Sequence, residues 1–361
     1  MGPGFWHDRR VFVTGHTGFK GGWLSLWLTA QGARVSGYSL APPTSPNLFE
    51  LAEVQGCLAQ SDIADILDIE SLRKRLLKSE AEVVFHLAAQ SLVRESYVAP
   101  VQTYATNVMG TAHVLDACRQ QSSVKVVVVV TSDKCYDNRE WVWPYREIDP
   151  LGGHDPYSSS KGCAELVTAA YGRSFFDKPG SHCSITSVRA GNVIGGGDWA
   201  KDRLVVDLIA GLSTGERIVI RNPSAIRPWQ HVLEPLSGYL AVAEKLWTQG
   251  QSPWEAWNFG PSSGEERTVK EIAELISGLW GREDLVVMGS TAGHPHEAKL
   301  LALDSSKART VLGWRPRLTF QEGVSLTVEW FKKYLAGESM RDVTLAQIAI
   351  FERRGLGAVD G

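Results

Sequence analysis

A tyrosine and a lysine four positions apart are the residues best suited to chemistry in this sequence. Tyr157 and Lys161 bound the stretch Tyr-Ser-Ser-Ser-Lys, and on a helix two side chains at this spacing share one face. A free tyrosine has a pKa of about 10, so its phenol is a poor base at neutral pH. A lysine cation beside it stabilises the phenolate and lowers that pKa. The pair predicts a base that takes a proton from a substrate hydroxyl while hydride leaves the same carbon.

Three polar residues follow a strongly apolar stretch of the chain. Ser132, Asp133 and Lys134 come directly after the valine run Val126–Val130, and a strand buried on both faces is expected over Lys125–Ser132. Active sites of open parallel sheets gather at the carboxyl ends of the strands. We therefore expect Ser132 to hydrogen-bond a substrate hydroxyl, and Asp133 and Lys134 to exchange protons with the substrate. The alternative is that these side chains only cap the strand.

A glycine-rich turn near the N-terminus predicts a dinucleotide site. It follows the predicted strand Val11–Thr14 and opens a predicted helix from Gly21 to Gln31. Glycines in such a turn let the backbone approach a pyrophosphate, which the amino end of the helix attracts. A turn that serves packing alone is the alternative. The residues expected at the cofactor are Gly15, His16, Thr17, Gly18, Phe19, Lys20 and Gly21.

The second predicted strand, Ala33–Leu40, bears on which nicotinamide dinucleotide is bound. In this kind of fold an acidic residue at the end of that strand holds the adenosine ribose of NAD. The strand ends here in Gly37-Tyr-Ser-Leu40, so the acid is missing. No arginine follows to accept a 2′-phosphate. The pattern favours NAD, leaves NADP open, and predicts weak retention of the cofactor.

Short β-rich runs alternate with helical stretches through the first half of the chain. This alternation predicts an α/β fold, a doubly wound parallel sheet of the Rossmann type. The pattern then loosens into a smaller α+β substrate domain, so we expect domains 1–184 and 185–361, with segments of the second able to return to the first. The other elements expected are a strand ending near Asp65, a helix over Ile69–Lys78 capped by Asp68, strands over Val83–Leu87 and Ile185–Arg189, and helices near Tyr104–Arg119, Leu204–Gly211 and Leu236–Thr248.

Bulk composition narrows the class of protein. The 361 residues are 43% hydrophobic and 21% charged, with a net charge of −3. No global field therefore favours nucleic acid or an anionic membrane. Five cysteines without paired spacing predict neither a disulfide framework nor a zinc site. The chain start has no apolar core of a signal peptide and no apolar run is long enough for a membrane span, so we expect a cytoplasmic protein with no metal.

Several motifs, taken in order, resemble the extended short-chain dehydrogenase/reductases. Besides the glycine turn and the Tyr/Lys pair, they are His86-Leu-Ala-Ala-Gln90, Asn107-Val-Met-Gly-Thr111 and Arg189-Ala-Gly-Asn-Val-Ile-Gly195. Within that family the chain is similar to the nucleotide-sugar 4,6-dehydratases. Most members carry a glutamate where Lys134 stands, and a lysine there is a feature of the CDP-glucose branch. The segments that resemble this branch are Ser132–Trp143, Arg189–Arg203, Ile226–Pro235 and His294–Glu297, within a likeness running from about Trp6 to beyond Trp314.

The resemblance implies further binding residues. At the cofactor, Asp65 and Ile66 would meet the adenine, and Ala88, Ala89 and Thr106 would line the cleft beside Tyr157 and Lys161. An arginine fork suits the oxygens of a diphosphate, although surface roles for the cationic residues and a loop-capping role for the histidine are alternatives. The residues expected at the substrate are Gln90, Ser132, Asn192, Lys201, Arg203, Arg227, Asn258 and His296.

The resemblance also implies a reaction. NAD would stay bound while Tyr157 takes the 4-hydroxyl proton of CDP-glucose, water leaves across C5 and C6 with Asp133 as acid, and hydride returns to C6, giving CDP-4-keto-6-deoxy-D-glucose. Whether Lys134 or Asp133 takes the C5 proton is open. Alternatives are a nucleotide-sugar 4-epimerase, a 4,6-dehydratase for another nucleotide sugar, and a dinucleotide-sensing protein without catalysis. A homodimer would form through helices near Val101–Gln120 and Gly162–Arg173.

Overall fold

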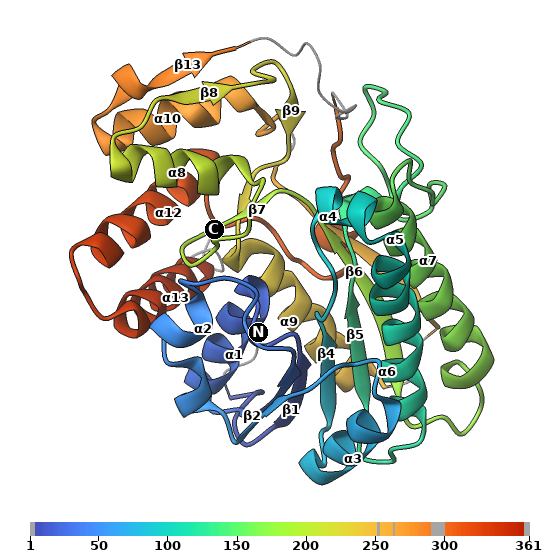
Figure 1. Cartoon of the computed structure of the whole chain (residues 1–361). Coiled ribbons are helices and arrows are strands. Elements are labelled where there is room, and N and C mark those ends of the chain that lie inside the picture. Colours follow the sequence, from blue (N-terminus) through green and yellow to red (C-terminus); the bar gives the residue numbers. More distant parts are fainter. Residues whose placement is uncertain (1–3, 251–252, 263, 290–299, 357–361) are drawn as a thin grey trace.

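The computed structural model describes residues 4–250, 253–262, 264–289 and 300–356, and its centre is a parallel sheet (Figure 1). The sheet has seven strands in the order β11-β6-β5-β4-β1-β2-β3. This arrangement confirms the predicted doubly wound, Rossmann-type sheet. The strands are β1 Arg10–Thr14, β2 Arg34–Ser39, β3 Gln60–Ile63, β4 Val83–His86, β5 Val126–Val130, β6 Ser184–Ala190 and β11 Glu255–Phe259.

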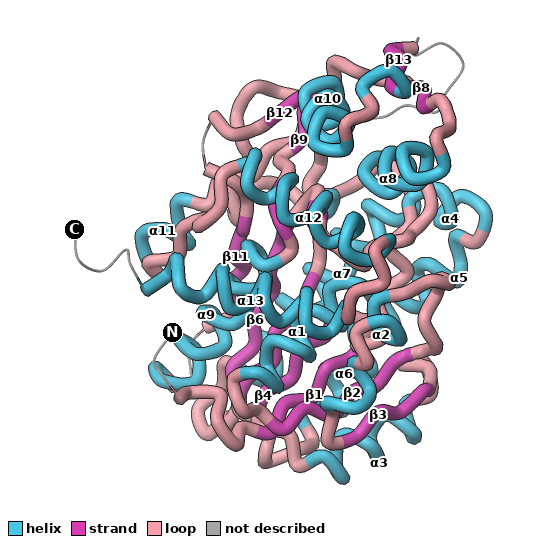
Figure 2. Tube along the Cα trace, turned by 90° about the vertical axis from the view of Figure 1, so that its left-hand side faces the viewer, coloured by secondary structure: helices cyan, strands magenta, loops and turns pink. Residues whose placement is uncertain are grey.

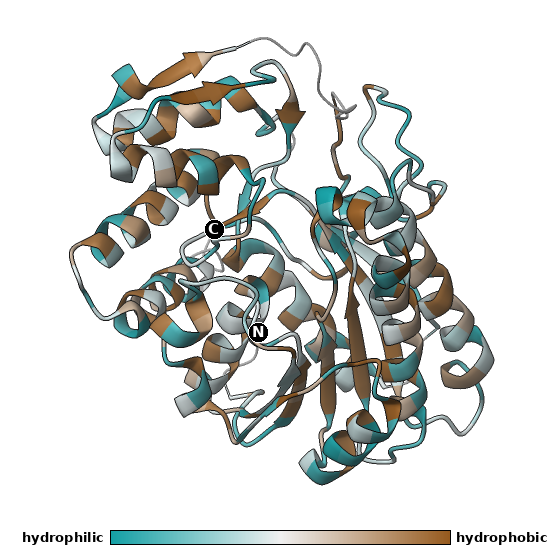
Figure 3. Cartoon of the chain, viewed as in Figure 1, coloured by the Kyte–Doolittle hydropathy of each residue, from teal (hydrophilic) through white to brown (hydrophobic). Residues whose placement is uncertain are grey.

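Helices cover both faces of the sheet (Figure 1), and Figure 2 looks onto the face that is covered by α1. On β5, Val126, Val128 and Val130 pack into one core with helices α1 and α9, whereas Val127 and Val129 pack into another with α3 and α6. This is why the whole strand is apolar, and Figure 3 shows the central strands in the hydrophobic colour. The covering helices are α1 Phe19–Ala30, α3 Ile69–Ser79, α6 Gly110–Arg119, α7 Pro156–Tyr171 and α9 Leu233–Gln249.

The second half of the chain adds short paired strands and a group of helices beside the carboxyl edge of the sheet (Figure 1). β6 begins at residue 184, and both β6 and β11 belong to the main sheet. The strand pairs are β7 Val193–Ile194 with β10 Gln230–His231, β8 Ile218–Ile220 with β13 Val286–Met288, and β9 Ile226–Arg227 with β12 Arg267–Thr268. The helices are α8 Leu204–Thr214, α10 Val269–Trp280, α11 Ser306–Val311, α12 Phe320–Leu335 and α13 Met340–Leu356.

Local signals placed most element ends within a few residues. Asp68 caps α3 as predicted, accepting the Ser71 N–H at 3.0 Å. The helix expected over Tyr104–Arg119 is instead part of a longer run: α4 Val93–Val98, α5 Pro100–Tyr104, a π-helical turn and α6 follow one another. Within the described residues, no helix combines the length and apolar character needed to cross a membrane.

Candidate active site

The glycine-rich turn is shaped by close backbone contacts. Gly15 has φ +78°, and a Cβ on Gly21 would lie 2.1 Å from the Gly15 carbonyl oxygen. A Cβ on Gly15 itself would lie 2.7 Å from the Ala88 nitrogen. Gly18 caps α1 without a side chain, so no side-chain oxygen competes for the amides of the first turn. The turn thus presents a helix amino end suited to a phosphate.

Two side chains of this turn point inward and brace it. His16 is fully buried, and its Nε2 lies 2.8 Å from Ser61 Oγ. Burial lowers the pKa of His16 to about 4, so the ring is neutral at pH 7. Thr17 Oγ1 donates to the Leu40 carbonyl at 2.8 Å. These contacts give both residues a packing role, and their contact with a cofactor stays a prediction.

Phe19 and Lys20, at the start of α1, lie toward the carboxyl end of β5. This end of the sheet, where Ser132, Asp133 and Lys134 follow the strand, is called the reaction edge below. A Cβ on Gly195 would lie 3.1 Å from Phe19 Cζ, so the ring bridges the turn and the β7 segment. Burial lowers the pKa of Lys20 to about 8, and the cations Arg203 and Lys161 act in the same direction. Lys20 therefore lies near Lys161 and Asp133, which are catalytic candidates, and near Arg203, a substrate-binding candidate. Its position in a phosphate-binding turn did not predict this.

The residues expected at the adenine end of the cofactor lie beyond β3. Asp65 accepts the Tyr38 hydroxyl through its carbonyl at 2.9 Å, and Ile66 is buried. A Cβ on Gly110 would lie 2.3 Å from Ile66 Cδ1, so helix α6 packs closely here. The remaining three predicted lining residues are half-buried around the end of β4 and the π-helical turn: Ala88, Ala89 and Thr106.

Helix α7 carries the predicted tyrosine and lysine. Asp155 caps the helix by accepting the Ser158 N–H at 2.9 Å, and Pro156 occupies its first position. Tyr157 and Lys161 are both buried, at 7% and 6% exposure. Their polar atoms therefore act in a largely dry environment.

Burial opposes the charged form of both side chains. It raises the pKa of Tyr157 to about 12, against a hydrogen bond to Ser132 that lowers it. It lowers the pKa of Lys161 to about 8, against the carboxylate of Glu165 that raises it. The protein groups alone do not supply the lowered tyrosine pKa expected for a base. Among the charges that act on Tyr157, Arg203 lowers its pKa and Asp133 raises it.

The polar group after β5 is compact. Ser132 Oγ donates to Asp133 Oδ1 at 3.0 Å and accepts the Lys134 N–H at 3.2 Å. Asp133 is 2% exposed, and a Cβ on Gly191 would lie 1.8 Å from its Oδ2. Residue 191 must therefore be glycine for this carboxylate to lie between β5 and β6. Lys134 is half-buried beside it.

The predicted substrate residues are placed unequally. The Gln90 N–H donates to Asn107 Oδ1 at 2.9 Å, and its own amide nitrogen donates to Thr103 Oγ1 at 2.9 Å. Asn192, at φ +46°, lies between β6 and β7 and directly follows Gly191, against which the Asp133 carboxylate packs. His296 lies outside the described residues.

The cationic candidates come from the segments after β6. Arg203 forms an ion pair with the buried Asp198, whereas Lys201 is exposed. Arg227 stands on β9, where its Nη1 donates to the Ile226 carbonyl at 2.9 Å. Arg203 therefore lies near Lys20 and Tyr157, because its positive charge lowers the pKa of both side chains.

Asn258, the substrate candidate on β11, is bonded to protein groups in this structure. It is fully buried on β11, and its Oδ1 accepts the Tyr136 hydroxyl at 2.8 Å. Its Nδ2 donates to the carbonyls of Tyr145, at 2.8 Å, and Asp304, at 3.3 Å. The amide is bonded to the protein framework, and a contact of Asn258 with the substrate stays a prediction. An asparagine at a strand end gives the same sequence signal whether it binds a ligand or a loop.

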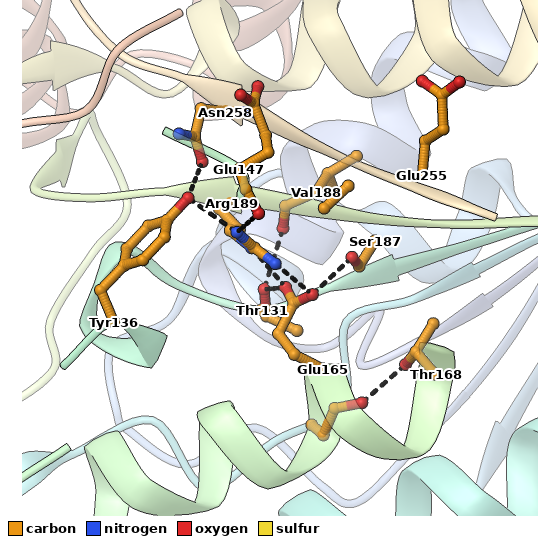
Figure 4. Close-up of polar contacts among 12 residues, drawn as sticks. Thr131, Tyr136, Glu147, Glu165, Thr168, Ser187, Val188, Arg189, Glu255 and Asn258 are labelled. Atoms are coloured by element: carbon orange, nitrogen blue, oxygen red, sulfur yellow. Dashed lines mark hydrogen bonds and ion pairs between the residues drawn. The ribbon is translucent and has the colours of Figure 1, made fainter. Parts of the chain in front are cut away.

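Sequence reasoning missed a buried ion pair behind the site (Figure 4). Glu165 on α7 and Arg189 on β6 are 0% and 1% exposed, and the guanidinium meets the carboxylate in two hydrogen bonds of 2.9 and 2.8 Å. The signal available in the sequence was Arg189, a charged residue inside a strand predicted for the central sheet. Charged residues at such positions need a partner.

Fold and site together define an enzyme of the short-chain dehydrogenase/reductase class. A profile of the GDP-mannose 4,6-dehydratase family matches residues 12–327, and the chain belongs to this family. It is 54% identical to a CDP-glucose 4,6-dehydratase of Salmonella typhimurium over 340 residues, covering 93% of this chain and 94% of that one. It is 31% identical to a dTDP-glucose 4,6-dehydratase of Streptomyces antibioticus, over 76% of this chain and 75% of the other.

Solved structures agree with the fold. A UDP-glucose 4-epimerase of Thermotoga maritima, solved with UDP-glucose, superposes with a TM-score of 0.79 at 24% identity, over 90% of this chain and 99% of that chain. A dTDP-glucose 4,6-dehydratase of Streptomyces venezuelae, solved with NAD bound, gives a TM-score of 0.77 at 24% identity, over 92% and 99%. At this level of identity the likeness establishes the architecture.

Proposed function

We propose that this chain is a CDP-glucose 4,6-dehydratase that uses NAD as a catalytic cofactor and forms CDP-4-keto-6-deoxy-D-glucose. The observation that carries the proposal is the 54% identity, over nearly the whole length of both chains, to the Salmonella enzyme of that activity. Lys134 supports the same branch, because the related dehydratases usually have a glutamate there.

The glycine turn fits the dinucleotide. The close approach of Gly21 to the Gly15 carbonyl leaves no room for a larger residue, and the first turn of α1 has no side-chain cap. Gly15 to Gly21 would hold the pyrophosphate, Asp65 and Ile66 would meet the adenine, and the cleft would be lined by Ala88, Ala89 and Thr106. NAD supplies a hydride acceptor for C4 and a hydride donor for C6, so it is regenerated in each turnover.

The first task of the protein is to remove the 4-hydroxyl proton. Tyr157 takes it through its phenolate oxygen, and the Lys161 cation stabilises that phenolate. Ser132 hydrogen-bonds the same substrate hydroxyl and the tyrosine, which orients the proton transfer. Burial favours the neutral phenol, so formation of the phenolate depends on nearby positive charge, which a protonated Lys161 would supply.

The second task is loss of water across C5 and C6. The 4-ketone acidifies the C5 proton; Lys134 takes that proton and Asp133 gives one to the departing C6 hydroxyl, so the carbon–oxygen bond breaks as the C5–C6 double bond forms. Asp133 carrying both protons is the alternative assignment. The position of Asp133 against Gly191 keeps its carboxyl in the reaction edge in either case.

The diphosphate and sugar meet cations from the second half of the chain. Arg203 and Arg227 would bind the diphosphate, since guanidinium groups bind such oxygens in pairs. Lys201, His296, Asn192 and Gln90 would complete the substrate contacts. Arg203 forms an ion pair with Asp198 in this structure. On substrate binding it would either leave Asp198 for the diphosphate or bind both.

A homodimer would use the outer face of α4, α5 and α7. Apolar side chains stand out from this face: Val98 and Val101 are 79% and 81% exposed, and Leu166 on α7 is 59% exposed. Exposed apolar residues on packed neighbouring helices are typical of a subunit interface. Sedimentation of the purified protein should give a dimer, and Val101→Glu together with Leu166→Glu should give a monomer.

Turnover across CDP-, dTDP-, GDP- and UDP-glucose tests the function. CDP-glucose should give a 4-keto product with its characteristic absorbance in base, and added NAD should raise the activity of purified protein. A 4-hydroxyl inverted without loss of water would identify a 4-epimerase. Binding of NAD without turnover of any of the four sugars would leave only the sensing alternative.

A further inference from the structure

The carboxylate of Glu165 joins the catalytic helix to the end of β5. Glu165 follows Lys161 by one helical turn and Tyr157 by two on α7. It accepts the Thr131 hydroxyl, and its Oε2 accepts the Ser187 hydroxyl at 2.6 Å (Figure 4). Thr131 is the residue immediately before Ser132, so this bond fixes the point where the catalytic segment leaves the sheet.

Lys161 is anchored at the same place. Its Nζ donates to the Val130 carbonyl at 3.3 Å, one residue before the threonine that Glu165 holds. The ammonium and the carboxylate thus bind consecutive residues of one strand end. Glu165 is the largest of the neighbouring charges that favour the Lys161 cation.

Other titratable groups surround Lys161 from each packed element. Cys135, after β5, is a buried thiol whose raised pKa keeps it neutral, and Lys20 on α1 is a like charge whose own pKa is lowered to about 8. His86 on β4 is kept neutral by burial, its pKa being lowered to about 3. Glu165 is therefore the carboxylate that stabilises the Lys161 cation most strongly.

Arg189 extends the connection to the far end of the catalytic segment. Its Nη1 donates to the Tyr136 hydroxyl at 2.7 Å and to the Glu147 carbonyl at 3.2 Å. Tyr136 comes three residues after Asp133 and in turn donates to Asn258. Glu165 and Arg189 therefore bind Thr131 and Tyr136, which lie before and after Ser132, Asp133 and Lys134 in the chain.

We propose that Glu165 and Arg189 are positioning residues for catalysis: Glu165 holds the Lys161 cation beside Tyr157, and Arg189 neutralises Glu165 while fixing the segment that carries Ser132, Asp133 and Lys134. The inference rests on the proposed dehydratase function and explains why two charges are buried where an apolar pair would serve the core. A buried ion pair is by itself weak evidence for stability. Its contacts here lead to the reacting groups.

The pH profile of kcat separates this role from packing. Lys161 has to be protonated, so activity should fall as pH rises through its pKa of about 8. Glu165→Gln removes the favourable charge and leaves Arg189 unbalanced, so this alkaline limb should move down by about one pH unit or more. Arg189→Met should move it the other way. Lys161→Arg keeps its positive charge over this pH range, so its kcat profile should have no alkaline limb. That result would assign the limb to Lys161.

A double variant keeps the test open if a single variant does not fold. Glu165→Gln combined with Arg189→Met buries no lone charge, and its limb should move less than that of Glu165→Gln. Circular dichroism and thermal melting monitor folding. The matched control is Glu234→Gln, another buried carboxylate that accepts two backbone amides, at Arg317 and Leu318. Its limb should stay in place.

Two results would overturn the positioning role. One is a kcat that falls by the same factor at every pH in Glu165→Gln; the other is a double variant whose limb coincides with that of Glu165→Gln. Failure of the unmodified protein to convert CDP-glucose would instead count against the proposed function. An active parent enzyme with an unshifted limb in the folded variants counts against this inference alone.

Discussion

The reaction edge and the substrate-binding segments of this site are built differently. At the end of β5, Ser132, Asp133 and Lys161 are buried and bonded to backbone or to one another. On the segments after β6, the cationic candidates are half-exposed or exposed: Arg203 pairs with Asp198, Arg227 donates to a backbone carbonyl, and Lys201 is exposed.

The difference predicts which kinetic constant each region controls. Buried groups with fixed partners are pre-organised for the transition state, so their loss lowers kcat. Cations that exchange an acidic partner for a diphosphate bind the ground state and the transition state alike, so their loss raises KM. A residue whose removal moves the opposite constant would break the division.

Tyr157→Phe tests the reaction edge most severely. Without the phenol no base remains for the 4-hydroxyl proton, so kcat should fall by roughly 10²- to 10⁴-fold. The fold and the affinity for CDP-glucose, measured by calorimetry, should stay as in the parent, because the ring is kept. Turnover within about tenfold of the parent would remove Tyr157 from the chemistry.

Lys134→Met divides the reaction edge into its two tasks. Transient NADH from oxidation at C4 should survive, while exchange of the C5 hydrogen with deuterated solvent and release of water should fall by about 10²-fold or more. Rapid-mixing absorbance follows the first task and mass spectrometry the second. If C5 exchange continues at the parent rate, Asp133 is the better candidate for the base.

Arg227→Ala tests the substrate-binding side. Loss of one charge-assisted contact to a diphosphate should raise KM for CDP-glucose by about tenfold and change kcat much less. Arg221→Ala, an exposed arginine of the same segment, is a matched control that should leave both constants near the parent values. An unchanged KM in Arg227→Ala would give Arg227 a structural role on β9.

Glu234 lies outside both regions, and its effect should be the smallest and confined to stability. Burial raises its pKa to about 8 in the folded protein, above the ordinary value of 4.5. Between these two values the unfolded chain binds fewer protons than the folded one, so stability falls as pH rises through that window. Glu234→Gln should therefore raise Tm by a few °C at pH 8 and change it little at pH 5. An equal shift at both pH values would contradict the raised pKa.

Much of the fold could be predicted from local pattern. The valine run of β5, the glycine after α1 and the Asp68 cap each act through neighbours in the chain, so their elements were placed within a few residues. The π-helical turn before α6 was not predicted. It is set by Asn107, whose amide donates to the Gln90 carbonyl and to Ser160, both from other elements.

The sequence by itself predicted six of the seven strands of the sheet, the glycine turn and the helical spacing of Tyr157 and Lys161, because periodicity needs no distant contacts. Tertiary structure decided what depends on distant partners. Asn258 became a framework residue through Tyr136 and Tyr145, Lys20 came to lie among the catalytic charges, and the Glu165–Arg189 pair formed between α7 and β6. Each outcome depends on which groups meet after burial, when a polar atom has to find a partner in place of water.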